Sequence, residues 1–276
     1  MNGMHVLEVE HLNIWEERSG RVLVHDSSFR LAQGECLAIV GESGSGKSLT
    51  CKSLMRLNRT GVRQSGFVAL NGEDLSKLSD KEMRKFRGRR FCMIMQNGMS
   101  AFDPSRPIGA HLLETLGVHF NWSRAEMETR LTATMSSVGL KEPAVVMRSY
   151  PHELSGGMLQ RVMISLAIVL EPDVIIADEP TTALDAVTAY EVVEQFMRLR
   201  ERLGSAMIFV SHDLGAVRRI ADNVLVMKDG GVVEHGTTKN IFAGASHPYT
   251  RYLVSSKQAM SRHFEQLMGD ADVAKG

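Results

Sequence analysis

The sequence contains one Gly/Ser-rich run that fits the pattern G-x-x-x-x-G-K-[ST] without a substitution. The run reads Gly41-Glu42-Ser43-Gly44-Ser45-Gly46-Lys47-Ser48. Residues 35–40 before it are mostly apolar, and helix-forming residues from 49 to 57 follow it. Because glycine lets successive backbone amides point inward at an anion, a loop of this kind between a strand and a helix binds phosphate groups. The run therefore predicts a strand–loop–helix unit that holds the phosphates of a nucleotide.

Two side chains at the end of this run add specific chemistry. Lys47 is a mobile cation that can reach the β- and γ-phosphates of a nucleoside triphosphate. The hydroxyl of Ser48 is placed to become a ligand of Mg²⁺ as the chain enters the helix. The sequence thus predicts a nucleoside triphosphate and Mg²⁺ as cofactors.

Composition limits the class of protein and its surroundings. A chain of 276 residues can bury a substantial core as one large domain or two small ones. Lys plus Arg equals Asp plus Glu at 32 each, so a nucleic-acid or lipid partner would need a local basic patch. The three cysteines show no C-x-x-C pairing, and no apolar run approaches the roughly 20 residues that span a bilayer. We expect a protein of a reducing compartment that other subunits would hold at any membrane.

The order of apolar runs predicts strands that alternate with helices. Strands are expected at 6–14, 22–31, 66–72, 91–96, 173–179 and 206–210, with a closing hairpin at 224–234. Helices are expected at 108–147, with weak stops at Gly117 and Gly139, and at 158–170 and 186–203. This alternation favours a parallel sheet covered on both faces, with a helical insertion.

Two further features leave alternatives open. The preferred interpretation of the positive cluster between residues 81 and 90 is a solvated helix face, and the alternative is a nucleic-acid patch. Its members are Lys81, Arg84, Lys85, Arg87, Arg89 and Arg90. Trp15 lies in the opening segment, where an aromatic ring either stacks on an adenine or simply packs.

Two more segments carry chemistry that a phosphate loop needs. Asp178 and Glu179 end an apolar strand, where Asp178 can hold Mg²⁺ and Glu179 can orient and deprotonate an attacking water. The turn Ser155-Gly156-Gly157 begins a helix and offers a second anion site. Two phosphate-binding elements so far apart in sequence suggest that one of them serves a partner's nucleotide.

These residues together resemble the ATP-binding cassette (ABC) ATPases over nearly the whole chain. Besides the Walker A run, Gln96 resembles the Q-loop, residues 154–161 the signature, residues 174–179 Walker B, residues 183–185 the D-loop and His212 the switch histidine. The resemblance implies an α/β fold with a P-loop NTPase (RecA-like) core and parallel sheet, an antiparallel β subdomain and an inserted helical subdomain. It places the nucleotide-binding domain at 1–254, the helical subdomain at about 99–160, and a C-terminal helical tail at 255–276.

The resemblance also implies roles for single residues. Glu179 would activate water, His212 would contact the γ-phosphate, Lys47 would act in catalysis, and Trp15 aligns approximately with the adenine-stacking aromatic. The implied Mg²⁺ ligands are Ser48, Gln96 and Asp178. Two ATP molecules would lie in a head-to-tail dimer, each between Walker A of one subunit and the signature residues Ser155, Gly156 and Gly157 of the other.

Finer matches favour one branch of this family. The segments 93–97, 100–104 and 154–161, and His247-Pro248-Tyr249-Thr250, resemble the oligopeptide/nickel importer subfamily, most of all the D-type ATPases of nickel and opine-metallophore importers. Residues 249–276 lack the cysteines common in peptide importers, which favours the metal branch. We expect a peripheral protein at the cytoplasmic face of the bacterial inner membrane, with a paralogous ATPase, two permease subunits and an extracytoplasmic binding protein. A peptide importer and a nucleic-acid ATPase without permeases are the alternatives, although neutral charge and a single cassette argue against nucleic acid.

Overall fold

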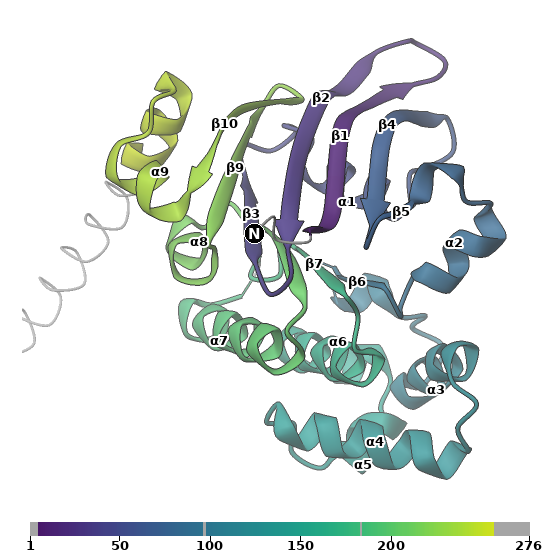
Figure 1. Cartoon of the computed structure of the whole chain (residues 1–276). Coiled ribbons are helices and arrows are strands. Elements are labelled where there is room, and N and C mark those ends of the chain that lie inside the picture. Colours follow the sequence, from purple (N-terminus) through teal and green to yellow (C-terminus); the bar gives the residue numbers. More distant parts are fainter. Residues whose placement is uncertain (1–4, 96–97, 183, 257–276) are drawn as a thin grey trace, which may run out of the picture.

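The computed structural model describes residues 5–95, 98–182 and 184–256, and within them the chain forms two sheets and two groups of helices (Figure 1). The larger sheet has the strand order β10-β9-β3-β8-β7-β6. Its strands are β3 (Cys36–Val40), β6 (Phe91–Ile94), β7 (Val174–Asp178), β8 (Ala206–Val210), β9 (Asn223–Lys228) and β10 (Gly231–Thr237). Neighbouring strands pair in parallel except β10, which forms an antiparallel hairpin with β9. The expected parallel sheet and closing hairpin are confirmed.

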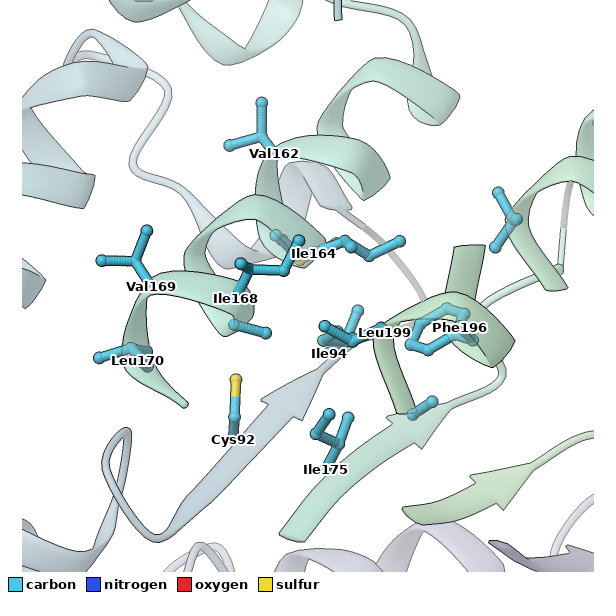
Figure 2. Packing of buried hydrophobic residues seen from close by; sticks show 14 of the residues in the cluster. Cys92, Ile94, Val162, Ile164, Ile168, Val169, Leu170, Ile175, Phe196 and Leu199 are labelled. Atoms are coloured by element: carbon cyan, nitrogen blue, oxygen red, sulfur yellow. The ribbon is translucent and has the colours of Figure 1, made fainter. Parts of the chain in front are cut away.

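Both faces of this sheet are buried, which explains why its strands are apolar throughout. Figure 1 shows α6 (Gly156–Leu170) and α7 (Ala186–Leu203) on one side of the sheet and the antiparallel sheet on the other. Figure 2 shows the first side at close range: Cys92 and Ile175 point from the sheet toward Ile168 of α6 and Phe196 of α7. Strands covered on both faces read as continuous hydrophobic runs, as residues 36–40 and 206–210 do.

The opposite face carries the helix that follows the phosphate loop and a small antiparallel sheet. This sheet has the order β2-β1-β4-β5. Its strands are β1 (His5–Glu16), β2 (Val22–Ala32), β4 (Val62–Leu70) and β5 (Glu73–Asp74). Leu12 and Ile14 of β1 share one core with Leu54 of α1 (Lys47–Leu54) and with Leu37 of β3. The antiparallel strands, the phosphate-loop helix and the parallel sheet therefore pack together in one core.

Helices fill the stretch between β6 and β7, as the sequence predicted. They are η2 (Gly98–Ala101), α3 (Ile108–His119), α4 (Arg124–Ser137), α5 (Pro143–Arg148) and η3 (Pro151–Glu153). The predicted stop at Gly139 is confirmed, since this residue follows α4 with a φ of 79°. The stop at Gly117 is wrong: Gly117 lies inside α3, which ends only where Phe120 stacks on Trp122 with ring centroids 3.7 Å apart.

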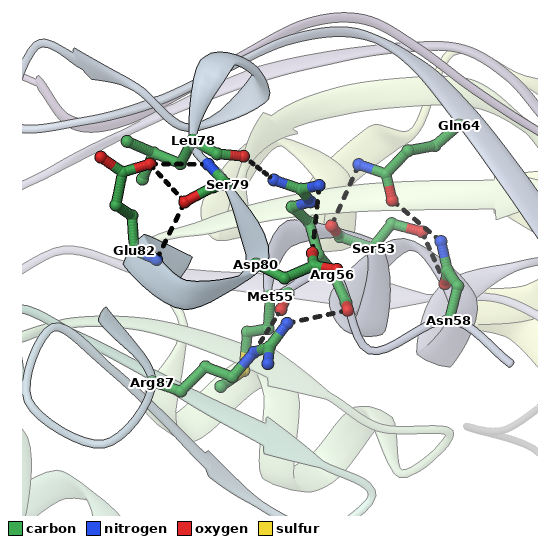
Figure 3. A network of polar contacts seen from close by, with 10 residues as sticks. All are labelled: Ser53, Met55, Arg56, Asn58, Gln64, Leu78, Ser79, Asp80, Glu82 and Arg87. Atoms are coloured by element: carbon green, nitrogen blue, oxygen red, sulfur yellow. Dashed lines mark hydrogen bonds and ion pairs between the residues drawn. The ribbon is translucent and has the colours of Figure 1, made fainter. Parts of the chain in front are cut away.

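In the basic segment four of the six cations are exposed, and Arg87 and Arg90 are partly buried. The segment contains η1 (Leu75–Lys77) and α2 (Asp80–Phe86). Figure 3 shows Arg87 donating from Nε to the Met55 carbonyl at 2.8 Å and from Nη2 to the Arg56 carbonyl at 3.0 Å. Arg56 in turn donates to Leu78 and pairs with Asp80 at 3.3 Å. Arg87 therefore satisfies carbonyls at the end of α1, a common use of a basic side chain at a helix C-terminus.

The C-terminal part returns to the edge of the larger sheet. It consists of α8 (Leu214–Ile220), which precedes the β9–β10 hairpin, then α9 (Thr238–Gly244) and a helix described over residues 248–256. Most of the predicted tail at 255–276 lies outside the described residues. Within the described part of the chain, no helix combines the length and apolar character needed to cross a membrane.

Candidate functional site

Three neighbouring strands bring the predicted site residues to one edge of the sheet. Gly41 directly follows β3 and Glu179 directly follows β7, whereas His212 is the second residue after β8. These strands are adjacent and parallel in the order β3-β8-β7, so their carboxyl ends meet at the same edge. This is the edge at which ligands bind in open α/β sheets. The topology therefore assembles residues that lie more than 170 positions apart in the sequence.

The phosphate loop adopts a conformation that excludes a side chain at its first position. Gly41 has a φ of 151°, and a Cβ atom there would lie 2.2 Å from the Met227 carbonyl oxygen. Lys47 is 5% exposed and donates from Nζ to the carbonyls of Gly41 and Glu42, at 2.8 Å each. Burial lowers the pKa of Lys47, and the nearby carboxylate of Glu179 opposes that shift. The loop thus folds around an ammonium group that backbone oxygens hold in place.

Ser48 and Asp178 meet beside this ammonium. The Ser48 hydroxyl donates to Asp178 Oδ1 at 2.7 Å, although the two residues lie 130 positions apart. Burial raises the pKa of Asp178, and the hydrogen bond from Ser48 acts in the opposite direction. A hydroxyl and a carboxylate side by side are the hard oxygen donors that Mg²⁺ prefers. The residues present therefore fit the predicted Mg²⁺ site, while Gln96, the third predicted ligand, lies outside the described residues.

Glu179 is held in a fixed place by a strained backbone and two polar neighbours. Its φ is 49°, and its amide donates to the Val210 carbonyl of β8 at 2.9 Å. Its Oε2 accepts from the Thr182 hydroxyl at 2.8 Å and lies 3.0 Å from Nδ1 of His212. Strained positions that the surrounding structure enforces are concentrated at functional sites. Thr182 was not predicted, although its position just after the Asp-Glu pair could have suggested it.

A cavity of ≈ 380 Å³ opens where these residues converge. Its lining residues are Val40, Gly41, Glu42, Ser43, Lys47, Glu179, His212, Leu214 and Leu253. The cavity therefore combines backbone amides, a cation, a carboxylate and an imidazole. This set can bind a phosphate chain and place a general base beside it.

The signature turn lies apart from this cavity. Ser155 caps α6 by accepting a hydrogen bond from the Met158 amide at 3.2 Å, and it is exposed. A Cβ atom on Gly157 would lie 3.2 Å from the Thr188 methyl of α7, so the turn packs closely on that helix. Asp185, from the predicted D-loop, caps α7. None of the three signature residues at 155–157 lines the cavity; Ser155 and Gly156 are exposed, and Gly157 is partly buried.

Two aromatic residues need separate description. Trp15 is partly buried on β1 and pairs with Val22 of β2. Val24, two residues further along β2, lies close to the phosphate loop: a Cβ atom on Gly46 would lie 2.9 Å from its methyl group. The structure thus places Trp15 on the strand pair that borders the loop, and its stacking on adenine stays a prediction. Tyr249 was noted in the sequence only for its resemblance, yet its hydroxyl accepts a hydrogen bond from the Glu42 amide at 3.0 Å.

Comparison with known proteins gives matches of three kinds: a family model, curated relatives and a solved structure. A family model described as ABC transporter matches residues 24–182. The metal-staphylopine import system ATP-binding protein CntD of Staphylococcus aureus is 45% identical over 265 residues, covering 96% of this chain and 98% of the relative. The dipeptide transport ATP-binding protein DppD of Bacillus subtilis is 40% identical over 255 residues, covering 91% and 76%. The solved structure of CbiO1 from Clostridium perfringens, part of the ABC transporter complex CbiONQ, has a TM-score of 0.73 at 26% identity and covers 87% and 91%.

The family model covers more than half of the chain, and the first relative matches it almost from end to end. The names of these two relatives, one for metal-staphylopine import and one for dipeptide transport, correspond to the metal and peptide branches that the short motifs indicated. The predicted fold class and ATPase activity are confirmed, and the chain belongs to the ABC transporter family as an ATP-hydrolysing subunit.

Proposed function

We propose that this chain powers an ABC importer that takes up a transition-metal chelate, such as a nickel complex of an opine-type metallophore. The observation that carries this proposal is the 45% identity to a metal-staphylopine import ATPase over nearly the full length of both chains. Dipeptide and oligopeptide import ATPases are 39–40% identical over 91–95% of this chain. Peptide import is therefore the second candidate, supported by a lower identity over a similar span.

The site geometry supports a specific division of labour in ATP hydrolysis. The loop amides and Lys47 hold the β- and γ-phosphates, and Glu179 takes a proton from a water molecule as its oxygen bonds to the γ-phosphorus. The bond from that phosphorus to the β–γ bridging oxygen breaks, and ADP leaves. His212, 3.0 Å from Glu179, holds the carboxylate and contacts the γ-phosphate. Ser48 and Asp178 would hold Mg²⁺, which would neutralise charge on the phosphate oxygens.

The exposed signature turn supports assembly with a second ATPase subunit. Ser155 caps the start of a 15-residue helix and is exposed together with Gly156, and an exposed helix N-terminus suits a γ-phosphate presented by another molecule. We infer a head-to-tail pair in which residues 155–157 complete the partner's site, with a paralogue as the partner. Two permease subunits and an extracytoplasmic binding protein complete the importer at the cytoplasmic face of the inner membrane.

The contacts of the basic segment argue against a nucleic-acid ATPase. Arg87 is committed to the carbonyls at the end of α1. Arg89 lies 4.6 Å from the centroid of the Phe120 ring, and Arg90 pairs with Asp173 at 2.8 Å. Cations that are paired within the protein are poorly available to phosphates of a nucleic acid. Lys81, Arg84 and Lys85 of the same segment are exposed, as the solvated-face interpretation expects.

Uptake measurements in a deletion strain test the proposal. The strain would lack this chain and receive either the wild type or Glu179→Gln, and uptake of radioactive nickel would be measured with and without an opine chelator, beside uptake of a labelled dipeptide. The wild type is expected to restore only chelated-metal uptake, and Glu179→Gln should lower it by about 10²-fold or more because the general base is lost. Restored dipeptide uptake without metal uptake would establish the second candidate instead.

A further inference from the structure

The peptide unit between Gly41 and Glu42 is held from both sides. Its carbonyl oxygen accepts a hydrogen bond from Lys47 Nζ at 2.8 Å, and its amide donates to the Tyr249 hydroxyl at 3.0 Å. A trans peptide points its C=O and N–H in opposite directions, and the described chain contains no cis peptide bond. Rotation of this one unit would therefore break both hydrogen bonds. Tyr249 and Lys47 are thus coupled through a single peptide plane.

Tyr249 is itself fixed by its surroundings. It is 8% exposed and belongs to an apolar cluster that includes Val40 of β3 and Val226 of β9. Lys228 Nζ lies 5.2 Å from the ring centroid, within the range of a cation–π contact. Leu253 lies one helical turn later, in the same cluster, and lines the nucleotide cavity. The ring therefore has little freedom to leave the position from which its hydroxyl meets the loop.

The start of the helix that carries Tyr249 is anchored to the larger sheet. Glu234 of β10 accepts hydrogen bonds from the Ser246 amide at 2.7 Å, the Ser246 hydroxyl at 2.8 Å and the His247 amide at 3.2 Å. Arg251 donates back to the Ser246 carbonyl at 2.6 Å. Burial alone would raise the pKa of Glu234, but hydrogen bonds to its carboxylate, including those from Ser246, lower it to about 2. A charged acceptor thus pins the turn immediately before Tyr249.

We propose that Tyr249 is a positioning residue for the ATPase: its hydroxyl orients the Gly41–Glu42 peptide and so sets where the Lys47 ammonium rests at the entrance of the phosphate loop. The C-terminal helix becomes part of the nucleotide-binding apparatus. Without the hydroxyl, the partly buried bond of the Glu42 amide is lost, and the peptide can turn the Gly41 carbonyl away from Lys47, which keeps its bond to the Glu42 carbonyl. Glu179 and His212 make no contact with this unit, so the chemical step at saturating ATP should be spared.

The variant Tyr249→Phe tests the proposal because it removes only the oxygen and keeps the ring. ATP affinity of the full chain would be measured by titration with a fluorescent ATP analogue and Mg²⁺, and KM and kcat in the assembled transporter. Affinity is expected to fall about 5- to 10-fold and KM to rise by the same factor, since one partly buried hydrogen bond to the loop is lost. The kcat value should stay within about 2-fold.

Two further variants make the result decisive. Tyr252→Phe removes the same atom from a ring that is 62% exposed on the same helix, and it should leave KM unchanged. Tyr249→Leu also removes the ring; it should show the KM of Tyr249→Phe together with a lower melting temperature. If Tyr249→Phe keeps the wild-type KM while Tyr249→Leu alone raises it, packing and not the hydroxyl governs affinity, and the proposal is overturned. A fall in kcat at unchanged KM would overturn it as well.

Discussion

The substitution Gly41→Ala isolates the steric demand of the phosphate loop. The added methyl carbon would lie 2.2 Å from the Met227 carbonyl oxygen and 2.8 Å from Ser45 Oγ. An ordinary carbon–oxygen contact is more than 3 Å, so a backbone carbonyl of β9 would have to move by about 1 Å. Overpacking of this kind costs about 1–3 kcal/mol, and the left-handed φ of 151° adds about 1–2 kcal/mol for a residue with a Cβ.

The matched control is Gly44→Ala in the same loop. Gly44 has a φ of 82°, but nothing lies within 4 Å of its Cβ position, so only the conformational cost of about 1–2 kcal/mol applies. For a chain of this size 1 kcal/mol shifts the melting temperature by about 2–4 °C. Gly41→Ala is therefore expected to lower the melting temperature by roughly 4–20 °C, and Gly44→Ala by roughly 2–8 °C.

Thermal unfolding followed by circular dichroism would give both melting temperatures, and the same samples would be titrated with ATP and Mg²⁺. Gly41→Ala should show the larger fall in both melting temperature and ATP affinity, because the Met227 carbonyl that must move is in direct contact with the first residue of the phosphate loop. Equal shifts for the two alanine variants would show that the contact at Gly41 relaxes freely, and the steric argument would then be refuted.

Three further substitutions test other parts of the structure. Glu234 has a pKa of about 2 against an ordinary 4.5, so its stabilisation is present above about pH 4.5 and lost as the pH falls toward 2. Glu234→Gln should lower the melting temperature at pH 7. The difference in melting temperature between this variant and the wild type should shrink below pH 4.5, and a constant difference would show that the ionised carboxylate is not its cause. Arg87→Ala should destabilise by about 1–2 kcal/mol in denaturant unfolding because two carbonyls at the end of α1 lose a donor, whereas Lys85→Ala, at an exposed position, should be silent. In the assembled transporter Lys47→Ala should empty one composite ATP site, and full occupancy of both sites in equilibrium dialysis would exclude the shared-site arrangement.

Local signals in the sequence were sufficient for much of the fold. The predicted bounds of α7 match the structure because Asp185 caps its start and Gly204 ends it with a φ of 61°. The strand 206–210 also matches, since an apolar run buried on both faces has sharp polar borders. Gly117 failed as a stop because a glycine inside a helix is a modest cost that packing of α3 readily outweighs.

The parts that escaped prediction depend on contacts between distant segments. Short helices such as α8 and α9 have seven residues each, too few for a clear apolar period. The hydrogen bond from the Glu42 amide to the Tyr249 hydroxyl joins residues 207 positions apart, and no sequence pattern near either residue predicts it. The site residues themselves were recognisable because each sits at the end of an apolar strand within a known motif. The two partners that hold them, Thr182 and Tyr249, required the fold.

The strand order has a consequence for how the protein is made. β3, which leads into the phosphate loop, pairs with β8 and β9, and its partner in β8 leaves the ribosome about 170 residues later. At typical synthesis rates of about 5–20 residues per second this interval lasts roughly ten to thirty seconds. Until β8 emerges, the apolar strand β3 lacks this strand partner, and the phosphate loop after it is incomplete. Nucleotide can therefore stabilise this protein only after β8 has been made, and until then the exposed apolar strand makes the nascent chain prone to aggregation.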